Sequence, residues 1–340
     1  MRQVLHLHAG FHKTGSTAIQ GYLFHNPLGS DHSYFHNNNP NSSLIILQAF
    51  RQNLADYQQF QHENFTPEDV LRIQKTARNR IAEIIQEIDK THTILSAESI
   101  GILNPAEHLK LYEFFKKYYK EIHVYIYIRT IKSRIESAYQ EILKTRYRSL
   151  QQPFPVSFKK SIGGFDQAFG KNRVHVCKFS KAEFAGGDVV NHFLGQLGIA
   201  RQDGQHSKDN TALSFPAIQL LYIYRTFFPT PVGGDNERIE RLGSLPGAAM
   251  HFHSDLFEKL LSQDSGDTQW LEDRAGFSVT EDIEAYNDSA IRSERELTAI
   301  SRESVRWLKE QQPDFRSRLR IRRGNLRSIA HGVRCLADAP

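Results

Sequence analysis

The order of apolar and polar positions predicts that strands and helices alternate along the first half of the chain. Runs rich in apolar, β-branched and aromatic residues, typical of buried strands, occur at 3–9, 33–36, 92–97, 122–128 and 173–178. Apolar residues at helical spacing predict helices at 15–25, 44–60, 66–88, 105–119 and 131–145. Strands that alternate with helices form mainly parallel sheets covered by helices, and such sheets bind ligands at the carboxyl ends of their strands.

The pattern changes after about residue 200, where no further strand is predicted. Helices are expected near 214–228, 235–242, 253–263, 281–292 and 294–311, separated by turns rich in glycine and proline. We therefore expect an α/β domain over 1–225, a helical extension over 226–312 that forms a lid or an acceptor surface, and a basic tail over 313–340.

The segment between the first strand and the first helix has the composition of an anion-binding loop. It reads Lys13-Thr14-Gly15-Ser16-Thr17 and joins an apolar run to an amphipathic helix. The backbone N–H groups and the dipole at a helix start attract negative charge, and Lys13 adds a full positive charge. Gly15 lets the backbone turn tightly and approach an anion. The alternative is a tight turn from strand to helix that binds no ligand.

The spacing of this loop differs from that in kinases and ATPases. In those enzymes a glycine stands directly before the lysine, whereas here His12 precedes Lys13 and Gly15 follows it. The variant resembles the 5′-phosphosulfate-binding loop of sulfotransferases, in particular of a group of bacterial sulfotransferase-like proteins. The resemblance implies a P-loop-type α/β fold, a mainly parallel sheet flanked by helices with a helical C-terminal extension. It also implies that residues 13–17 bind the 5′-phosphate of a nucleotide.

A second motif follows the strand expected at 122–128. Arg129 comes at the end of this strand, and Ser137 lies in the helix that follows. The arrangement resembles the sulfotransferase motif in which the arginine and the serine bind a 3′-phosphate. An arginine suits a terminal phosphate because its fork of donors is always charged. A lone arginine would be interpreted as part of a surface salt bridge, but beside the first loop the phosphate-binding interpretation is favoured.

Two anion sites on neighbouring strands imply a nucleotide that is charged at both its 5′ and 3′ positions. The resemblance identifies it as 3′-phosphoadenosine 5′-phosphosulfate (PAPS), the sulfuryl donor. Weaker similarities at 96–98, 186–195 and 210–214 extend the resemblance over about residues 1–225, although Thr211-Ala212 departs from the family pattern. No metal is expected. The strand at 122–128 does not end in the aspartate that holds magnesium in ATP enzymes, and no histidine pair has a spacing typical of metal ligands.

Sulfuryl transfer needs charge stabilisation on the departing phosphate and a base near the acceptor. Lys13 is expected to stabilise the leaving group. Glu98, at the end of the strand at 92–97, is the first candidate for the general base. The sequence is equally compatible with a structural role for Glu98, in which its carboxylate caps the next turn or pairs with a lysine. His12, which could instead orient the loop, is the second candidate, and His36 is the third.

Composition and charge agree with a folded protein that handles anionic ligands. Charged residues make up 24% and hydrophobic residues 39% of the 340, and the net charge is +5. The two cysteines, Cys177 and Cys335, are too few for a disulfide framework or a metal cluster. The first strand begins almost at the N-terminus and no apolar stretch is long enough to cross a membrane, so we expect a cytoplasmic protein.

The acceptor is less well defined by the sequence. The resemblance favours a hydroxyl or amine on a carbohydrate or a lipid-linked molecule. Residues 315–334 carry seven arginines and no acidic residue, which predicts a solvated tail or a frayed helix. The alternative is a contact with a polyanionic acceptor or with the anionic face of a membrane, as a peripheral protein would make.

Two other functions are compatible with the sequence. An ATP-dependent small-molecule kinase with a variant P-loop would need magnesium and would be indifferent to Arg129 and Ser137. A non-catalytic nucleotide or glycan binder of the same fold would bind the nucleotide product without turnover. Nucleic acid is not an expected partner, because the basic residues outside the tail are mixed with acidic ones and no aromatic–basic motif occurs.

Overall fold

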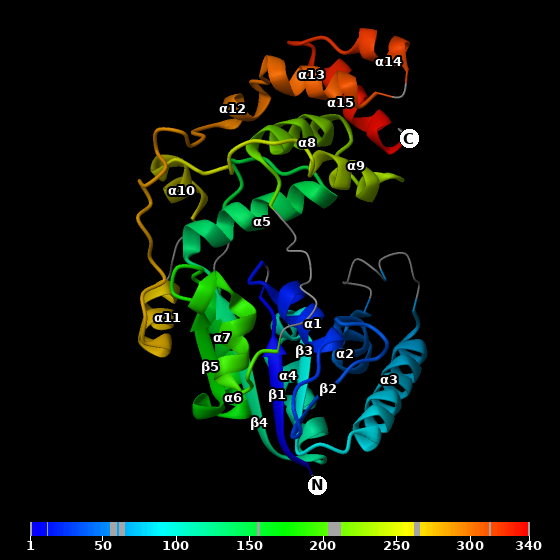
Figure 1. Ribbon diagram of the computed structural model, residues 1–340, viewed down its shortest axis with the longest axis vertical. Helices are drawn as coiled ribbons and strands as arrows, with labels where there is room; N and C mark the ends of the chain where they lie inside the picture. The colour runs from blue at the N-terminus through cyan, green and yellow to red at the C-terminus, as the bar shows by residue number, and fades with distance from the viewer. Residues whose placement is uncertain are drawn as a thin grey trace. The chain divides into compact units, whose positions relative to one another are not determined.

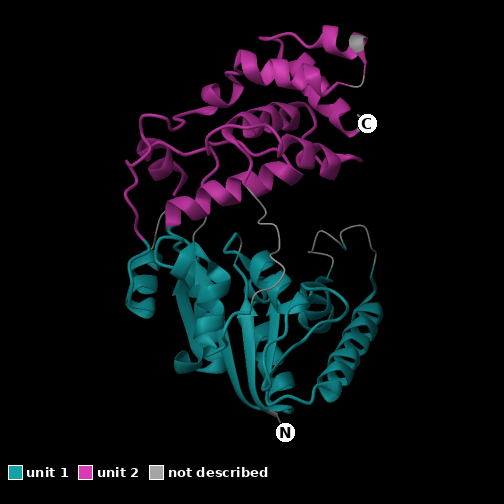
Figure 2. Cartoon of the chain, viewed as in Figure 1, with its two compact units in different colours: residues 1–130, 157–209, 266–279 teal, residues 131–156, 210–265, 280–340 magenta. Residues whose placement is uncertain are grey.

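The chain forms two compact units, shown in different colours in Figure 2. The computed structural model describes residues 2–11, 13–54, 60, 65–154, 157–202, 212–261, 266–312 and 314–338. Unit 1 comprises residues 1–130, 157–209 and 266–279, and unit 2 comprises residues 131–156, 210–265 and 280–340. The chain therefore passes between the units several times. Helices distant in sequence pack together in each unit. The division into segments 1–225, 226–312 and 313–340, with their expected roles, stays a prediction.

Unit 1 is built on a five-stranded parallel sheet (Figure 1). Its strands are β1 (Arg2–Ala9), β2 (His32–Tyr34), β3 (His92–Ala97), β4 (Tyr119–Ile128) and β5 (Val174–Lys178). They lie in the order β2-β3-β1-β4-β5, and every neighbouring pair is parallel. The sheet confirms the predicted α/β fold and places the carboxyl end of β1, where the loop expected to bind an anion begins, in the middle of the sheet.

Helices cover both faces of this sheet. Those of unit 1 are α1 (Ser16–His25), α2 (Ser43–Phe50), α3 (Pro67–Glu87), α4 (Pro105–Phe115), α6 (Phe158–Phe169), α7 (Val189–Gln196) and α11 (Asp267–Ala275). The connections β1–α1–β2 and β3–α4–β4 run in opposite directions across the sheet. Because such crossovers are right-handed, α1 and α4 lie on opposite faces. Helix α7 packs beside α1, and α6 packs beside α4.

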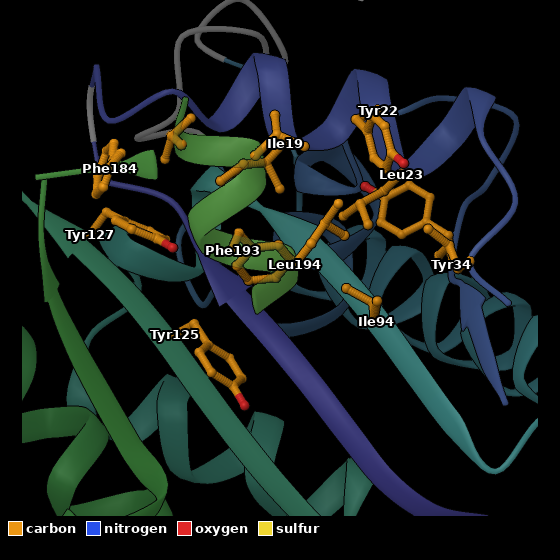
Figure 3. Packing of buried hydrophobic residues seen from close by; sticks show 13 residues of the cluster. Ile19, Tyr22, Leu23, Tyr34, Ile94, Tyr125, Tyr127, Phe184, Phe193 and Leu194 are labelled. Carbon is orange, nitrogen blue, oxygen red and sulfur yellow. The ribbon is translucent and has the colours of Figure 1, made fainter. Parts of the chain in front are cut away.

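The core between α1, α7 and the sheet positions the start of α1 (Figure 3). Ile19 of α1 and Phe193 of α7 are fully buried, and Tyr125 and Tyr127 of β4 belong to the same cluster. Burying a side chain of this size stabilises the fold by about 1.5–3 kcal/mol. The cluster therefore holds the first turn of α1 close to the end of β1.

The expected helix starts at Thr66 and Asn104 are confirmed. Each residue closes a capping box, and a proline occupies the first turn behind it. Helix α4 ends at Phe115, earlier than expected, because a turn follows and Tyr119 already belongs to β4.

Helix α6 was not predicted, because Gly163-Gly164 weakens the local preference for a helix. A Cβ at Gly164 would lie 3.0 Å from Nδ1 of His108 on α4. Close packing between the two helices therefore selects glycine at this position. The buried apolar residues of α6 do lie at helical spacing: Phe158, Ile162, Phe165 and Phe169.

The elements of unit 2 are helices. They are α5 (Ile131–Thr145), α8 (Phe215–Phe227), α9 (Asp235–Leu242), α10 (Ser254–Leu260), α12 (Glu294–Thr298), α13 (Arg302–Glu310), α14 (Phe315–Arg320) and α15 (Leu326–Arg334). Helix α8 is central and contacts α5, α12 and α15. Its Arg225 is fully buried and pairs with Asp235 at 2.8 Å, so the charge is compensated.

Two helix predictions in unit 2 are wrong. Residues 281–292 form turns rather than a helix, since their polar groups serve α5 instead. The backbone N–H of Ser133 donates to the Glu281 carboxylate at 2.9 Å, and Nζ of Lys132 donates to the Ile283 carbonyl at 2.6 Å. The helix expected at 294–311 is divided into α12 and α13, because Ser301 caps a new helix.

The arginine-rich segment expected to form a basic tail contains α14 and α15. Helix α15 packs against α8, and its Ile329, Ala330 and Val333 are fully buried. These apolar residues recur at helical spacing among the arginines, and their burial orders the segment. Helix α15 is therefore neither a solvated tail nor a frayed helix. No described helix is both long and apolar enough to cross a membrane.

Candidate functional site

The loop between β1 and α1 has the backbone form of an anion-binding loop. Lys13 (φ 62°) and Gly15 (φ 77°) both adopt the left-handed conformation, which is uncommon for a lysine. The buried hydroxyl of Thr14 donates to the Phe11 carbonyl at 2.7 Å and closes the turn. Left-handed residues at such a turn direct successive backbone N–H groups to one side, where they attract an anion.

The first turn of α1 offers further donors. Gly15 stands at the cap position, and no side chain among the described residues caps the helix there. By helix geometry, the N–H groups of Ser16, Thr17 and Ala18 have no acceptor within the helix. Together with the helix dipole they form a site that favours negative charge.

The hydroxyl of Ser16 is the observation most specific to a ligand. Ser16 is 3% exposed, and within the described residues its Oγ has no hydrogen-bond partner. A buried polar atom without a partner costs about 1–3 kcal/mol. An oxyanion in the loop would accept this hydrogen bond, so the residues present fit a bound phosphate or sulfate.

Two glycines permit the close packing of this loop. A Cβ at Gly10 would lie 2.5 Å from Oγ of Ser16 and 2.7 Å from Cγ of Glu98. The absence of a side chain at Gly10 therefore allows Ser16 and Glu98 to approach the same point. A Cβ at Gly15 would lie 2.6 Å from Cγ1 of Val189, which packs α7 against the loop.

Arg129 connects the second predicted motif to the first. Its Nε–H donates to the carbonyl of Lys13, and its guanidinium lies 4.6 Å from the centre of the Phe179 ring. Arg129 therefore holds the loop in its left-handed turn. The sequence indicated a phosphate-binding role for this arginine but gave no sign of the contact with the loop, which depends on the adjacent placement of β1 and β4.

The structure places the other candidate residues as follows. Glu98 is half-buried at the start of the short 3₁₀ helix η3 (Glu98–Ile102), directly after β3. Ser137 is half-buried on α5 and belongs to unit 2, so its pairing with Arg129 stays a prediction. His36 is exposed and packs edge-on against Phe24, 5.0 Å between ring centres. His12 lies outside the described residues, as do Asn210 and Thr211 of the segment expected at 210–214.

Sequence reasoning missed His8, which lies on β1 two residues before Gly10. The ring is fully buried in β1, and its Nδ1 lies 2.7 Å from Oγ of Ser96 on β3. Burial lowers the pKa of His8 to about 3, so the ring is neutral at physiological pH. The register that pairs His8 with Ser96 explains the contact. Only a known strand pairing could have revealed it, because the two residues are far apart in sequence.

Similarity to known proteins is found among solved structures. No protein-family model matches the sequence, and no curated protein matches it. Among solved structures, the chain is similar to a sulfotransferase from Alicyclobacillus acidocaldarius. The two are 14% identical with a TM-score of 0.44, and the match covers 82% of this chain and 97% of that one.

Proposed function

We propose that the protein is a sulfotransferase that moves a sulfuryl group from PAPS to a hydroxyl or amine of an acceptor. The proposal rests on the loop between β1 and α1. Its lysine, its left-handed turn and the uncapped start of α1 all favour an oxyanion. The buried Ser16 hydroxyl, unpartnered within the described residues, is the observation that carries it.

The nucleotide would be held at its two charged ends. The N–H groups of residues 15–17 and the hydroxyls of Ser16 and Thr17 would bind the 5′-phosphate. By the family resemblance, Arg129 and Ser137 would bind the 3′-phosphate. In this proposal Arg129 serves both the loop, through its contact with Lys13, and the nucleotide.

The chemistry needs little from the protein beyond position and charge. The acceptor oxygen or nitrogen would form a bond to sulfur while the bond between sulfur and the phosphate oxygen breaks. The Lys13 ammonium would stabilise the charge that develops on the departing phosphate. The Glu98 carboxylate would take the proton that the acceptor loses, because it lies beside Ser16 at the loop.

The acceptor remains within the class that the resemblance favours, a carbohydrate or a lipid-linked molecule. The kinase alternative shares the anion-binding loop with this proposal, but it has no role for a second phosphate-binding arginine. The decisive difference is therefore the nucleotide that binds.

The test is a calorimetric titration of the purified full chain with 3′-phosphoadenosine 5′-phosphate, beside ATP with magnesium. We expect saturable binding of the first nucleotide and weak or no binding of the second. A preference for ATP would overturn the proposal in favour of a kinase. With an acceptor in hand, Glu98→Gln should abolish turnover and leave nucleotide affinity unchanged, and unaltered turnover would exclude Glu98 as the base.

A further inference from the structure

The sheet of unit 1 carries a row of five histidines, one from each strand. The histidine row consists of His32 on β2, His92 on β3, His6 on β1, His123 on β4 and His175 on β5. Residues paired in a parallel sheet point to the same face, and side chains on each strand alternate between faces. The register pairs His32 with His92, Val4 with His92, His6 with His123, and Tyr125 with His175. All five rings therefore lie on one face of the sheet.

Three of these rings converge at one end of the row. Nε2 of His6 lies 3.1 Å from Nδ1 of His92, and the centre of the His32 ring lies 4.7 Å from that of His92. One ring nitrogen from each of the three lies within 4.8 Å of one from each of the others. His123 and His175 form a separate pair, with Nδ1 and Nε2 3.0 Å apart.

We propose that His6, His32 and His92 form a binding site for a divalent transition-metal ion, with Zn²⁺ the best fit. Zinc binds imidazole nitrogens at about 2.0–2.1 Å in tetrahedral geometry, which places ligand nitrogens about 3.4 Å apart. The His6 and His92 nitrogens, 3.1 Å apart, are already close to that spacing, and the His32 nitrogen lies within 4.8 Å of both. Imidazole ligands favour Zn²⁺, Cu²⁺ and Ni²⁺ over Mg²⁺ and Ca²⁺. Three protein ligands leave the fourth position to water.

A neighbouring tyrosine sets the direction of the central ligand. The hydroxyl of Tyr125 lies 3.3 Å from Nδ1 of His6. If Nδ1–H donates to this hydroxyl, the lone pair of His6 is on Nε2, the nitrogen that faces His92. A hydrogen bond to the second ring nitrogen is the usual way in which proteins orient a metal-ligating histidine.

The site is accessible and separate from the anion-binding loop. His6 is 7% exposed, whereas His32 and His92 are half-buried, so an ion can enter from the side of the edge strand β2. His6 lies four residues before Gly10 on an extended strand, about 13 Å away. A bound ion would join the three-residue strand β2 to the centre of the sheet, which is a structural role.

The test is a titration of the metal-free full chain with Zn²⁺, followed by calorimetry, and with Co²⁺, followed by visible absorption. We expect one saturable site, a Co²⁺ spectrum of tetrahedral nitrogen coordination, and a rise in Tm with Zn²⁺. His32→Gln and His92→Gln should each weaken Zn²⁺ binding at least tenfold. The matched control is His25→Gln, since His25 is an exposed histidine of the same unit outside the row. This control variant should bind Zn²⁺ with the affinity of the wild type.

Tyr125→Phe keeps the ring in the core and tests the site if a histidine variant fails to fold. It should weaken Zn²⁺ binding about tenfold, as loss of an orienting partner does. The proposal is overturned if the wild type shows no saturable binding, because the row is then held by contacts between the rings alone. It is also overturned if His123→Gln loses as much affinity as His92→Gln, or if His32→Gln, His92→Gln and Tyr125→Phe all bind as the wild type does. None of these outcomes decides the proposed nucleotide site, which the titration with 3′-phosphoadenosine 5′-phosphate tests separately.

Discussion

At the carboxyl end of β1, unit 1 presents a lysine, backbone N–H groups and a helix start, which together suit an anion. In the middle of the same strand, His6 joins His32 and His92 in a cluster of imidazoles that suits a cation. The first site is built from consecutive residues of one loop. The second is built from three strands, and its members are brought together only by the register of the sheet. The two sites thus share one sheet. The loop can be found in the sequence as a continuous motif, whereas the histidine cluster becomes visible only when the strands are paired.

The largest effect is expected from the charge in the loop. Lys13→Asn should lower kcat by about 10²–10³-fold, as does removal of a group that stabilises a developing anion. Asparagine tolerates the left-handed conformation that Lys13 adopts, so the loss reports charge rather than strain. Turnover is measured with PAPS and an acceptor, and Lys75→Ala, at an exposed lysine of α3, is the control. An unchanged kcat would remove Lys13 from the chemistry.

A smaller effect, on the free energy of unfolding, is expected when the pH is lowered and His108 on α4 becomes protonated. His108 is fully buried, stacks on Phe165 and bonds the carbonyl of Ile100 in the segment that begins with Glu98. Burial lowers the pKa of His108 from 6.5 to about 4. Between these values the unfolded state binds more protons than the folded state. The stabilisation is therefore full above pH 6.5 and is lost as pH falls toward 4, by at most about 3 kcal/mol.

Chemical denaturation between pH 7 and pH 4 measures this loss. His108→Gln, which keeps a donor for the Ile100 carbonyl but does not titrate in this range, should show a shallower dependence on pH than the wild type. Equal slopes for the two proteins would assign the acid sensitivity to other groups.

Arg129→Ala should separate the two roles of that arginine. Affinity for 3′-phosphoadenosine 5′-phosphate should fall by about 10–100-fold, the range for charge-assisted hydrogen bonds. Affinity for the analogue without the 3′-phosphate should fall less, through the loosened loop alone. Equal losses for both nucleotides would mean that Arg129 acts only on the loop. Arg80→Ala, at a surface ion pair of α3, is the matched control for calorimetry.

The smallest effect is expected from Ser16→Ala. The free energy of unfolding should stay unchanged or rise slightly, because the variant removes a buried hydroxyl that has no partner within the described residues. Nucleotide affinity should fall about tenfold, since a charge-assisted hydrogen bond is lost. Ser30→Ala, in an exposed turn, is the control for both measurements. Lower stability with unchanged affinity would contradict the assignment of Ser16 to the anion site.

Much of unit 1 was predictable from its local patterns. The five strands, the first turn of α1 and the capped starts of α3 and α4 depend on apolar runs, glycine, proline and capping residues that act over a few positions. Helix α6 was missed because its paired glycines oppose a helix locally, while packing against α4 favours it. In unit 2 the segment 281–292 was misread because its polar groups are used by α5, which no local pattern reveals.

The sequence by itself determined the alternation of strands and helices and the left-handed turn that we propose as an anion site, because each depends on residues that are neighbours along the chain. The tertiary structure decided the contact of Arg129 with the loop, the position of Glu98 beside Ser16, and the burial of α15 among the helices of unit 2. It also decided the histidine row, whose members have no spacing in common along the chain. Strand register aligns them, and register is set by the packing of the whole sheet rather than by any one strand.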